Sequence, residues 1–226
     1  GVGKIMKLGQ LQLESSVEDQ VYQVYLYERE LSELPDNLPA TVRMNFVCAA
    51  NHLTTLRGCS NRVGQNFDCS ANLLTSLEFG PAYVGGKYNC SNNELTSLKF
   101  SPRKVGFFDC SVNHSLTSIE GCPNEIGLNF WCVANGLTTL HDVHKHIISV
   151  GGNFACYNNT ITSCILGLML IHIEGNIITT LGKSNSPGAP TQVDVILNKW
   201  KNQGRKGVLG AQRELLDLGY DELAKL

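Results

Sequence analysis

The sequence predicts an α/β-type solenoid, mostly β, in which short parallel strands stack coil upon coil, and three observations predict it. Six cysteines recur at intervals of 20 to 24 residues. An aromatic residue stands two positions before each of these cysteines, and an asparagine stands three positions after it. An aliphatic residue and a threonine then follow. Self-similarity at such a period is typical of repeat proteins, because one coil buries its apolar edge only against neighbouring coils.

The repeated positions keep one register through six units. The cysteines are Cys48, Cys69, Cys90, Cys110, Cys132 and Cys156. The aromatic residues are Phe46, Phe67, Tyr88, Phe108, Phe130 and Phe154. The asparagines are Asn51, Asn72, Asn93, Asn113, Asn135 and Asn159. The aliphatic–threonine pairs run from Leu53-Thr54 to Ile161-Thr162, and the fourth unit carries one extra residue before Leu116.

Strand alternation assigns each position of a unit to the inside or the outside. In "NFDCS", Phe67 and Cys69 point inward, whereas Asn66 and Asp68 point outward. The amide of Asn72 is placed to pair with backbone groups of the turn, which would otherwise be buried without partners. A unit near 21 residues leaves no room for a full helix, so we expect an extended return arm or one tight helical turn.

Two weaker units flank the six. Upstream, Val24, Leu26, Leu31 and Leu34 keep the spacing, with Arg29 in the asparagine position. Downstream, Ile171, Ile173, Ile178 and Leu181 keep it, with Asn176 in the asparagine position. We therefore expect a solenoid of about eight coils over residues 22–183.

The first segment, residues 1–21, is expected to be a β cap. Both "KIMKLGQLQLE" and "QVYQVYLYE" alternate like strands, with "SSVEDQ" between them. This pattern predicts a β-hairpin that leads into the first coil.

The last segment, residues 184–226, is expected to be a linker followed by helices. The stretch "GKSNSPGAPT" is rich in helix and strand breakers. After it, Val193, Ile196, Leu197 and Trp200 share one helical face, with Thr191 as the N-cap. A second helix in "KGVLGAQRELLDLGYDELAKL" ends at Gly219. The helices are interpreted as a cap over the last coil; a separate partner-binding or dimerising hairpin is the alternative.

The cysteines are interpreted as small apolar side chains that fill a narrow interior. Parallel side chains in successive coils rarely meet the dihedral angle of a disulfide, and closely spaced zinc-binding pairs are absent. Cys59 and Cys122 lie outside this column, in turns before the next strand, and we expect them to be more reactive toward thiol reagents.

Composition narrows the function classes. The net charge of −2 gives no global electrostatic case for nucleic acid or an anionic membrane. The longest apolar stretch, Cys164–Ile173, is roughly half as long as a membrane span. An odd number of cysteines and the lack of a signal-like start favour a reduced, cytoplasmic setting.

A histidine cluster and a basic cluster are two further candidate binding sites. His141, His144 and His146 could bind a transition metal, although a lengthened exposed loop is the simpler interpretation, and the question stays open. The basic residues around Trp200 could contact phosphates, although a solvated helix end is the simpler interpretation. They are Lys199, Lys201, Arg205 and Lys206.

The outward positions of the strands form the predicted binding surface. The early coils are polar there, with Asn45, Val47 and Asn66 beside the candidate site residues. The expected partner-binding residues are Asp68, Lys87, Asn89, Phe107, Asp109, Trp131, Val133 and Tyr157. Phe107, Trp131 and Tyr157 are bulky aromatic residues on consecutive coils, and such residues are enriched among binding hot spots. A loop or the C-terminal segment folding over them is the alternative.

The repeat is identified as a leucine-rich repeat, with the aromatic residue and cysteine in two strand positions that leucine usually fills. The unit "VGQNFDCSANLLTSLEFGP" resembles the short-repeat proteins of tailed bacteriophages, and "ILNKWKNQGRKGVLGAQRELLDLGYDELAKL" is similar to the ending that those proteins often carry. This resemblance covers nearly the whole chain after Val42. It implies a setting in the cytoplasm of a phage-infected bacterium and no single activity.

A second resemblance is weaker. The "LTSL" units and "LSELPDNLPA" are similar to the repeats of secreted bacterial ubiquitin-ligase effectors. About 40 residues follow the solenoid, too few for the catalytic domain of those effectors, so ligase activity is not implied.

These observations predict a non-enzymatic protein–protein interaction module without a cofactor. We expect it to bind, and to inhibit, a bacterial host protein such as a defence enzyme through its strand face. The alternatives are a nucleic-acid-binding accessory protein that uses the C-terminal basic helix and a structural component of the virion. The partner and the oligomeric state do not follow from the sequence.

Overall fold

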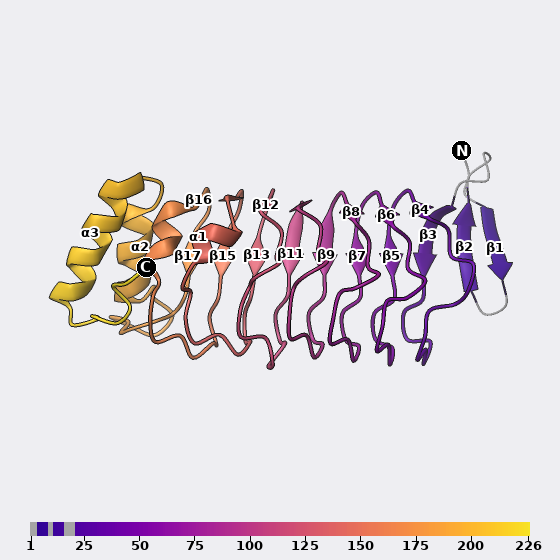
Figure 1. Ribbon diagram of the computed structural model, residues 1–226, viewed down its shortest axis with the longest axis horizontal. Helices are drawn as coiled ribbons and strands as arrows, with labels where there is room; N and C mark the ends of the chain where they lie inside the picture. The colour runs from indigo at the N-terminus through magenta and orange to yellow at the C-terminus, as the bar shows by residue number, and fades with distance from the viewer. Residues whose placement is uncertain (1–3, 9–10, 16–20) are drawn as a thin grey trace.

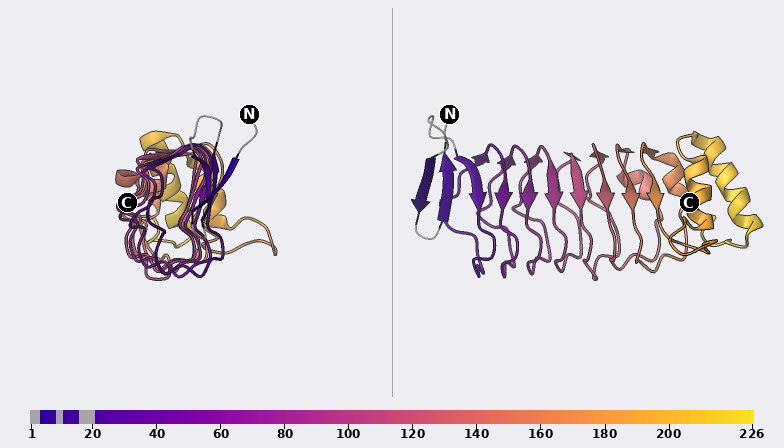
Figure 2. Two further views of the ribbon diagram at one scale, coloured as in Figure 1. Left: turned by 90° about the vertical axis from the view of Figure 1, so that its right-hand side faces the viewer. Right: turned by 180° about the vertical axis from the view of Figure 1, so that it is seen from behind.

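The computed structural model describes residues 4–8, 11–15 and 21–226. Its body is a parallel β-solenoid, extended along one axis, with two helices at its C-terminal end (Figure 1). The end-on view of Figure 2 shows the coils superimposed as one narrow ring. The predicted solenoid of short strands is therefore confirmed.

One sheet runs the length of the molecule. Its order is β1-β2-β3-β5-β7-β9-β11-β13-β15-β17. The strands are β1 (Lys4–Leu8), β2 (Leu11–Ser15), β3 (Val21–Tyr25), β5 (Phe46–Val47), β7 (Phe67–Asp68), β9 (Lys87–Asn89), β11 (Phe107–Asp109), β13 (Phe130–Trp131), β15 (Phe154–Ala155) and β17 (Ile177–Ile178). The eight strands from β3 to β17 pair in parallel and enclose about seven turns.

Shorter sheets line the side where the chain turns toward each of these strands. The first contains β4 (Thr41–Val42), β6 (Arg62–Val63) and β8 (Tyr83–Val84). The second contains β10 (Lys104–Val105), β12 (Glu125–Ile126), β14 (Ser149–Val150) and β16 (His172–Ile173). The first residue of most of these strands is exposed and the second is buried, as strand alternation requires.

The core consists of columns of like residues along the axis. The six aromatic residues and the six cysteines are buried. Neighbouring rings of the aromatic column lie 5.0 to 5.9 Å apart between centroids. Several cysteines also donate their thiol to the next coil, as Cys69 does to the carbonyl of Asn89. The cysteine column is therefore a packing column, as the sequence predicts.

The asparagines form the expected ladder. The amide nitrogen of Asn72 donates to the carbonyls of Cys48 and Cys69, and its Oδ1 accepts from the backbone N–H of Leu53. One side chain thus pairs backbone groups of two coils. The residue before each ladder asparagine, for example Ala71 with φ 53°, has left-handed backbone geometry, which makes the turn.

The flanking coils differ in how well their register was predicted. The upstream register is confirmed, since Val24 pairs with Phe46. The downstream register is wrong by a few positions, because Ile177 pairs with Phe154 and Asn176 lies on the outside. The coil lacks the aromatic–cysteine pair that marks the register in the other units.

The N-terminal β segment contains one more strand than expected. The stretch read as a single strand is two, β1 and β2, which pair antiparallel with Leu8 opposite Leu11. β2 then pairs antiparallel with β3. The glycine at position 9 interrupts the alternating pattern and is the sequence signal for this reversal.

Helical segments occur late in the chain. They are α1 (Val143–His146), the 3₁₀ helix η1 (Leu166–Leu170), α2 (Gln192–Trp200) and α3 (Gly204–Asp217). Thr191 caps α2 as predicted, because its side chain accepts from the N–H of Asp194. Gly219 has φ 84° just after α3, as the predicted helix stop requires. α1 occupies the lengthened return arm of the fifth unit.

Helix α2 pairs with both sheets at the end of the solenoid. The buried carboxylate of Asp194 accepts from the N–H and hydroxyl of Thr179. One turn later, Asn198 donates to and accepts from the backbone of Ile177 in β17. Just beyond the helix, Asn202 does the same for Ile173 in β16. Side chains of one helical face thereby take the place of another strand.

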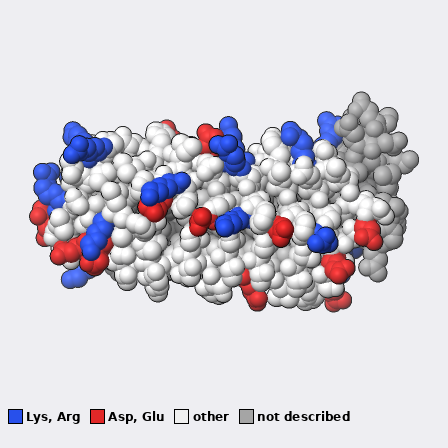
Figure 3. All heavy atoms as spheres, in the orientation of Figure 1, with Lys and Arg blue, Asp and Glu red and all other residues white. Residues whose placement is uncertain are grey.

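Charges on the return-arm face alternate in sign along the axis. The position after the second aliphatic residue holds Arg57, Glu78, Lys99 and Glu120 in successive coils. Figure 3 shows blue and red side chains alternating along the middle of this face. Among the described residues, no ion pair joins these four side chains. No helix among the described residues is long and apolar enough to cross a membrane.

Candidate functional site

The outer face of the long sheet presents three columns of side chains. They lie before, between and after the buried aromatic–cysteine pair. The first column contains Asn45, Asn66, Lys87, Phe107, Asn129, Asn153 and Asn176. The second column contains Tyr25, Val47, Asp68, Asn89, Asp109, Trp131, Ala155 and Ile178. The third column contains Tyr27, Ala49, Ser70, Ser91, Ser111, Val133 and Tyr157. All eight predicted partner-binding residues belong to these columns.

A cluster of two aromatic rings and one lysine occupies the middle of this face. The rings of Phe107 and Trp131 pack edge to face, with centroids 4.8 Å apart and planes at 79°. The ammonium of Lys87 lies 4.5 Å from the centroid of Phe107 and 5.7 Å from that of Trp131. Among the described residues, no carboxylate lies within ion-pair distance of Lys87. The cluster therefore combines an uncompensated cation with apolar surface.

The cluster lies where a surface ladder of asparagines is interrupted. The Oδ1 atoms of Asn45 and Asn66 accept from the backbone N–H one coil further on. The Oδ1 atoms of Asn129 and Asn153 make the same bond toward the C-terminus. Lys87 and Phe107 occupy the two intervening positions. The interruption replaces small side chains that bond to backbone with two long ones that do not.

A missing residue accounts for part of the interruption. The chain takes six positions from Val84 to Cys90 but only five from Val105 to Cys110. The strand residues still pair in register, with Phe107 opposite Lys87. The lost position is therefore at the corner before β11, and the aromatic residue takes the asparagine position.

The acidic residues of the face are bound to their own strands. The Oδ1 of Asp68 accepts from the N–H and the hydroxyl of Ser70. The Oδ1 of Asp109 accepts from the N–H of Ser111, and Asn89 makes the equivalent bond to the next serine. Asp109 is only 7% exposed, so its predicted role as a contact residue rests on a largely covered side chain.

Of the three aromatic residues predicted to form a run, Phe107 and Trp131 are in ring contact and Tyr157 lies apart from them. Trp131 and Tyr157 are each 36% exposed, so neither is covered by a loop. Among the described rings, none contacts Tyr157, which lies in the third column. Val133 is half-buried, and its N–H donates to the hydroxyl of Ser111.

Two exposed tyrosines were missed by the sequence reasoning. Tyr25 and Tyr27 are 51% and 41% exposed on the first coil, with ring centroids 6.3 Å apart. Tyr25 lies between Val24 and Leu26, and Tyr27 follows Leu26. The sequence places Val24 and Leu26 on the inside. The strict alternation of "VYLY" was the available signal, since it places both tyrosines outward.

The C-terminal end of the face is hollowed beneath the linker. A hollow of about 670 Å³ is lined by Ile178 and Thr180 of the last coil, Pro190 of the linker, and Val195 and Lys199 of α2, among others. The end-on view of Figure 2 shows the linker as an orange loop that protrudes beyond the ring of coils. The linker and α2 therefore bound the strand face at its C-terminal end.

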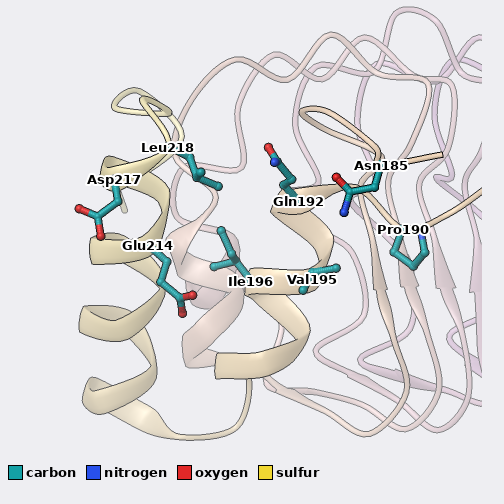
Figure 4. A pocket seen from close by; sticks show the side chains of 8 residues that line it. All are labelled: Asn185, Pro190, Gln192, Val195, Ile196, Glu214, Asp217 and Leu218. Carbon is teal, nitrogen blue, oxygen red and sulfur yellow. The ribbon is translucent and has the colours of Figure 1, made fainter.

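A smaller hollow lies on the other side of Val195. Its volume is about 320 Å³. Glu214 and Asp217 of α3 and Leu218 just after that helix line it, together with residues of α2 and the linker (Figure 4). Glu214 accepts from the indole N–H of Trp200 and from Lys199. Its pKa is lowered by these two donors. The hollow therefore carries a carboxylate that is already paired.

The basic residues near Trp200 are only partly available. Lys199 forms an ion pair with Glu214, and Lys201 donates to the carbonyl of Gly175. Arg205 and Lys206 remain exposed at the start of α3. Contact of this cluster with phosphates therefore stays a prediction, which rests mainly on Arg205 and Lys206.

The three histidines do not converge. His141 contacts Asp142 and the carbonyl of Leu226, whereas His144 is packed against η1 near Gly167. The described part of the chain contains no group of three or more histidine, cysteine or acidic side chains arranged to hold a metal ion.

Burial affects the thiols of Cys59 and Cys122 outside the column. Burial raises the pKa of both Cys59 and Cys122 to about 12, which disfavours the reactive thiolate. Cys122 is 6% exposed and Cys59 is half-buried, whereas the thiol of Cys69 in the column is fully buried, so their higher relative reactivity stays a prediction. Within the column, burial raises the pKa of Cys69 and its equivalents well above the ordinary value.

Comparison of the chain with protein-family models, with curated proteins and with solved structures found no match. The candidate site therefore rests on the geometry of the strand face.

Proposed function

We propose that the protein is a binding module of the leucine-rich repeat class that recognises a protein partner through its strand face. One observation carries the proposal: Lys87, Phe107 and Trp131 form a cluster at the centre of that face, in which Trp131 is exposed and the other two are half-buried. Accessible aromatic residues beside a cation are the kind of anchor on which binding energy concentrates.

The surroundings support a binding role. Tyr25 and Tyr27 at one end and the hollow under the linker at the other give the face further contact surface. The polar residues between them are held by hydrogen bonds to their own strands, as with Asp68 and Ser70. A face fixed in this way loses little conformational entropy when a partner binds.

The C-terminal helices are assigned a capping role in this proposal. Asp194, Asn198 and Asn202 pair with the last strands of both sheets and so hide backbone groups that would invite another strand. The strand face, rather than the helices, is then the surface for the partner.

The partner class is proposed from the resemblance of the repeats to those of tailed bacteriophages. A bacterial host protein is the expected partner, and inhibition of a defence enzyme is the specific form that we propose. Binding rather than catalysis is the proposed activity.

Affinity capture from a bacterial lysate tests the proposal. The bait is the full chain, compared with a variant in which Phe107, Trp131 and Tyr157 are alanine. The matched control replaces Phe79, Phe100 and Leu128, which are exposed on other sides of the coils. We expect a captured protein that the control retains and the strand-face variant loses, with a Kd at least tenfold weaker when measured on the purified pair. Equal recovery by all three baits would exclude this face.

A further inference from the structure

The short sheets are interrupted between β8 and β10, and among the described residues two backbone N–H groups there make no backbone hydrogen bond. At other junctions two successive N–H groups donate to one carbonyl of the preceding coil, as Ala82 and Tyr83 do to Asn61. The N–H groups of Asn124 and Glu125 likewise donate to Arg103. Among the described residues, no hydrogen bond of this kind is made by the N–H groups of Arg103 and Lys104.

The missing corner residue explains the interruption. In complete coils the glycine of the corner donates to the preceding strand, as Gly85 does to Val63 and Gly127 to Val105. Gly106 donates instead to the carbonyl of Gly86, at 2.9 Å. Because one residue fewer spans the corner, Gly106 is shifted relative to the equivalent glycines of other coils. As a result β10 does not pair with β8.

A groove follows the interruption on the molecular surface. It has a volume of about 380 Å³ and is lined by Tyr83, Gly85, Pro102, Arg103, Lys104 and Gly106, among others. Arg103 and Lys104 are its only charged lining residues. Both are exposed, and neither is in an ion pair within the described part of the chain.

Tyr83 lines the groove on the side of β8. Its ring is covered by the guanidinium of Arg62 in the preceding coil, 3.8 Å from the ring centroid. Its hydroxyl lies beside Gly85, where a Cβ would meet the carbonyl of Gly64 in the same preceding coil. Tyr83 therefore bounds the groove, and the donors in it come from the other side.

The local charge favours an anion. One acid lies nearby, because Glu125 is the register partner of Lys104 in the next coil. The carbonyl of Ala82 also faces the junction. Against these stand the side chains of Arg103 and Lys104 and their two backbone N–H groups. Multiple donors of this kind match an oxyanion with several acceptor oxygens.

We propose that the groove between β8 and β10 binds a phosphate group. Arg103 and Lys104 bind its oxygens through their side chains and backbone N–H groups. The phosphate belongs to a small ligand, a nucleotide or a phosphorylated protein; the chemistry recognised is the same. This site is independent of the strand face.

A titration of the full chain with inorganic phosphate at constant ionic strength, followed by amide nuclear magnetic resonance, tests the site. We expect saturable shifts of the Arg103 and Lys104 amides. Because a charged hydrogen bond contributes about 1.5 kcal/mol or more, we expect Arg103→Gln and Lys104→Gln each to weaken binding about tenfold. Glu125→Gln should strengthen it.

Lys99→Gln is the matched control, since it removes the same charge from an exposed residue of the return arm five positions before Lys104. Parallel titrations with a mononucleotide and a phosphoserine peptide identify the source by tighter binding. Amides of Arg103 and Lys104 that do not move in any titration would overturn the proposal. So would a loss of affinity in Lys99→Gln equal to that in Lys104→Gln, because the effect would then be one of net charge.

Discussion

The rings of Phe107 and Trp131 meet edge to face on the outside of the sheet, although their residues lie 24 positions apart in neighbouring coils. The pair exists because Phe107 takes the position of a ladder asparagine. We expect a double-mutant cycle with leucine at both positions to give a coupling energy of about 0.5–1.5 kcal/mol in urea unfolding. The same cycle between Phe107 and Tyr157, which lack a ring contact, should give less than about 0.5 kcal/mol. Equal couplings would contradict the geometry.

Tyr88 buries a hydroxyl in a column that otherwise holds phenylalanine. No hydrogen-bond partner for this hydroxyl is found in the described part of the chain. A buried unpaired polar group costs about 1–3 kcal/mol, so Tyr88→Phe should raise the free energy of unfolding. The converse change, Phe67→Tyr, should lower it. Chemical denaturation of both variants is the measurement, and a less stable Tyr88→Phe protein would refute the expectation.

Asn72 and Asn66 belong to an interior and a surface ladder of the same coil. Asn72→Ala leaves the N–H of Leu53 without its acceptor. It also removes one of two side-chain donors from the carbonyls of Cys48 and Cys69, which keep the amides of Asn51 and Asn93. At about 1–3 kcal/mol for one buried unpaired group, we expect a loss of about that size, which weakens the stacking of neighbouring coils.

Asn66→Ala is the control, because its amide bonds to the exposed N–H of Lys87. Surface substitutions usually change stability by about 0.5 kcal/mol or less. The comparison is made by urea unfolding and by hydrogen exchange of the amides around each position. Similar losses in the two variants would show that burial does not decide the contribution of the ladder.

The cysteine column makes stability depend on alkaline pH. Burial raises the pKa of Cys48, Cys69, Cys90, Cys110 and Cys132 well above the ordinary value. The unfolded chain then loses protons above about pH 8.5 while the folded chain keeps them. Stability is therefore fully present below that pH and falls as pH rises, by about 1.4 kcal/mol per pH unit for each thiol.

Unfolding in urea with a reductant at pH 7 and pH 9.5 measures this dependence. Cys69→Ala should lower stability at pH 7, because it leaves space in the core, but should reduce the fall between the two pH values by the share of one thiol. An unchanged fall in this variant would show that the thiols are not its cause.

Much of the fold could be predicted from the sequence because the repeat encodes it locally. The spacing of Phe67, Cys69 and Asn72 specifies which side chains enter the core and where the chain turns. Every complete unit has the same spacing. The prediction of register failed at Asn176, where the aromatic–cysteine pair is absent. It also failed at β1 and β2, where alternation continues across a chain reversal.

The candidate site could be predicted only as a surface. Alternation placed Lys87, Phe107 and Trp131 outward, but their mutual contact depends on how neighbouring coils stack. Asp109 was predicted to be exposed from the same alternation, and its burial depends on the larger residues beside it.

By itself, the sequence determined the solenoid, the interior columns and the outward face, since each follows from residue type at a fixed period. Only the tertiary structure decided what one missing residue at a corner does. It preserves the pairing of Phe107 with Lys87 in the long sheet and separates β10 from β8 in the short ones. The physical reason is that a coil one residue shorter cannot keep the hydrogen bonds of both sheets, and the buried column of Phe108 and Cys110 holds the long sheet in register.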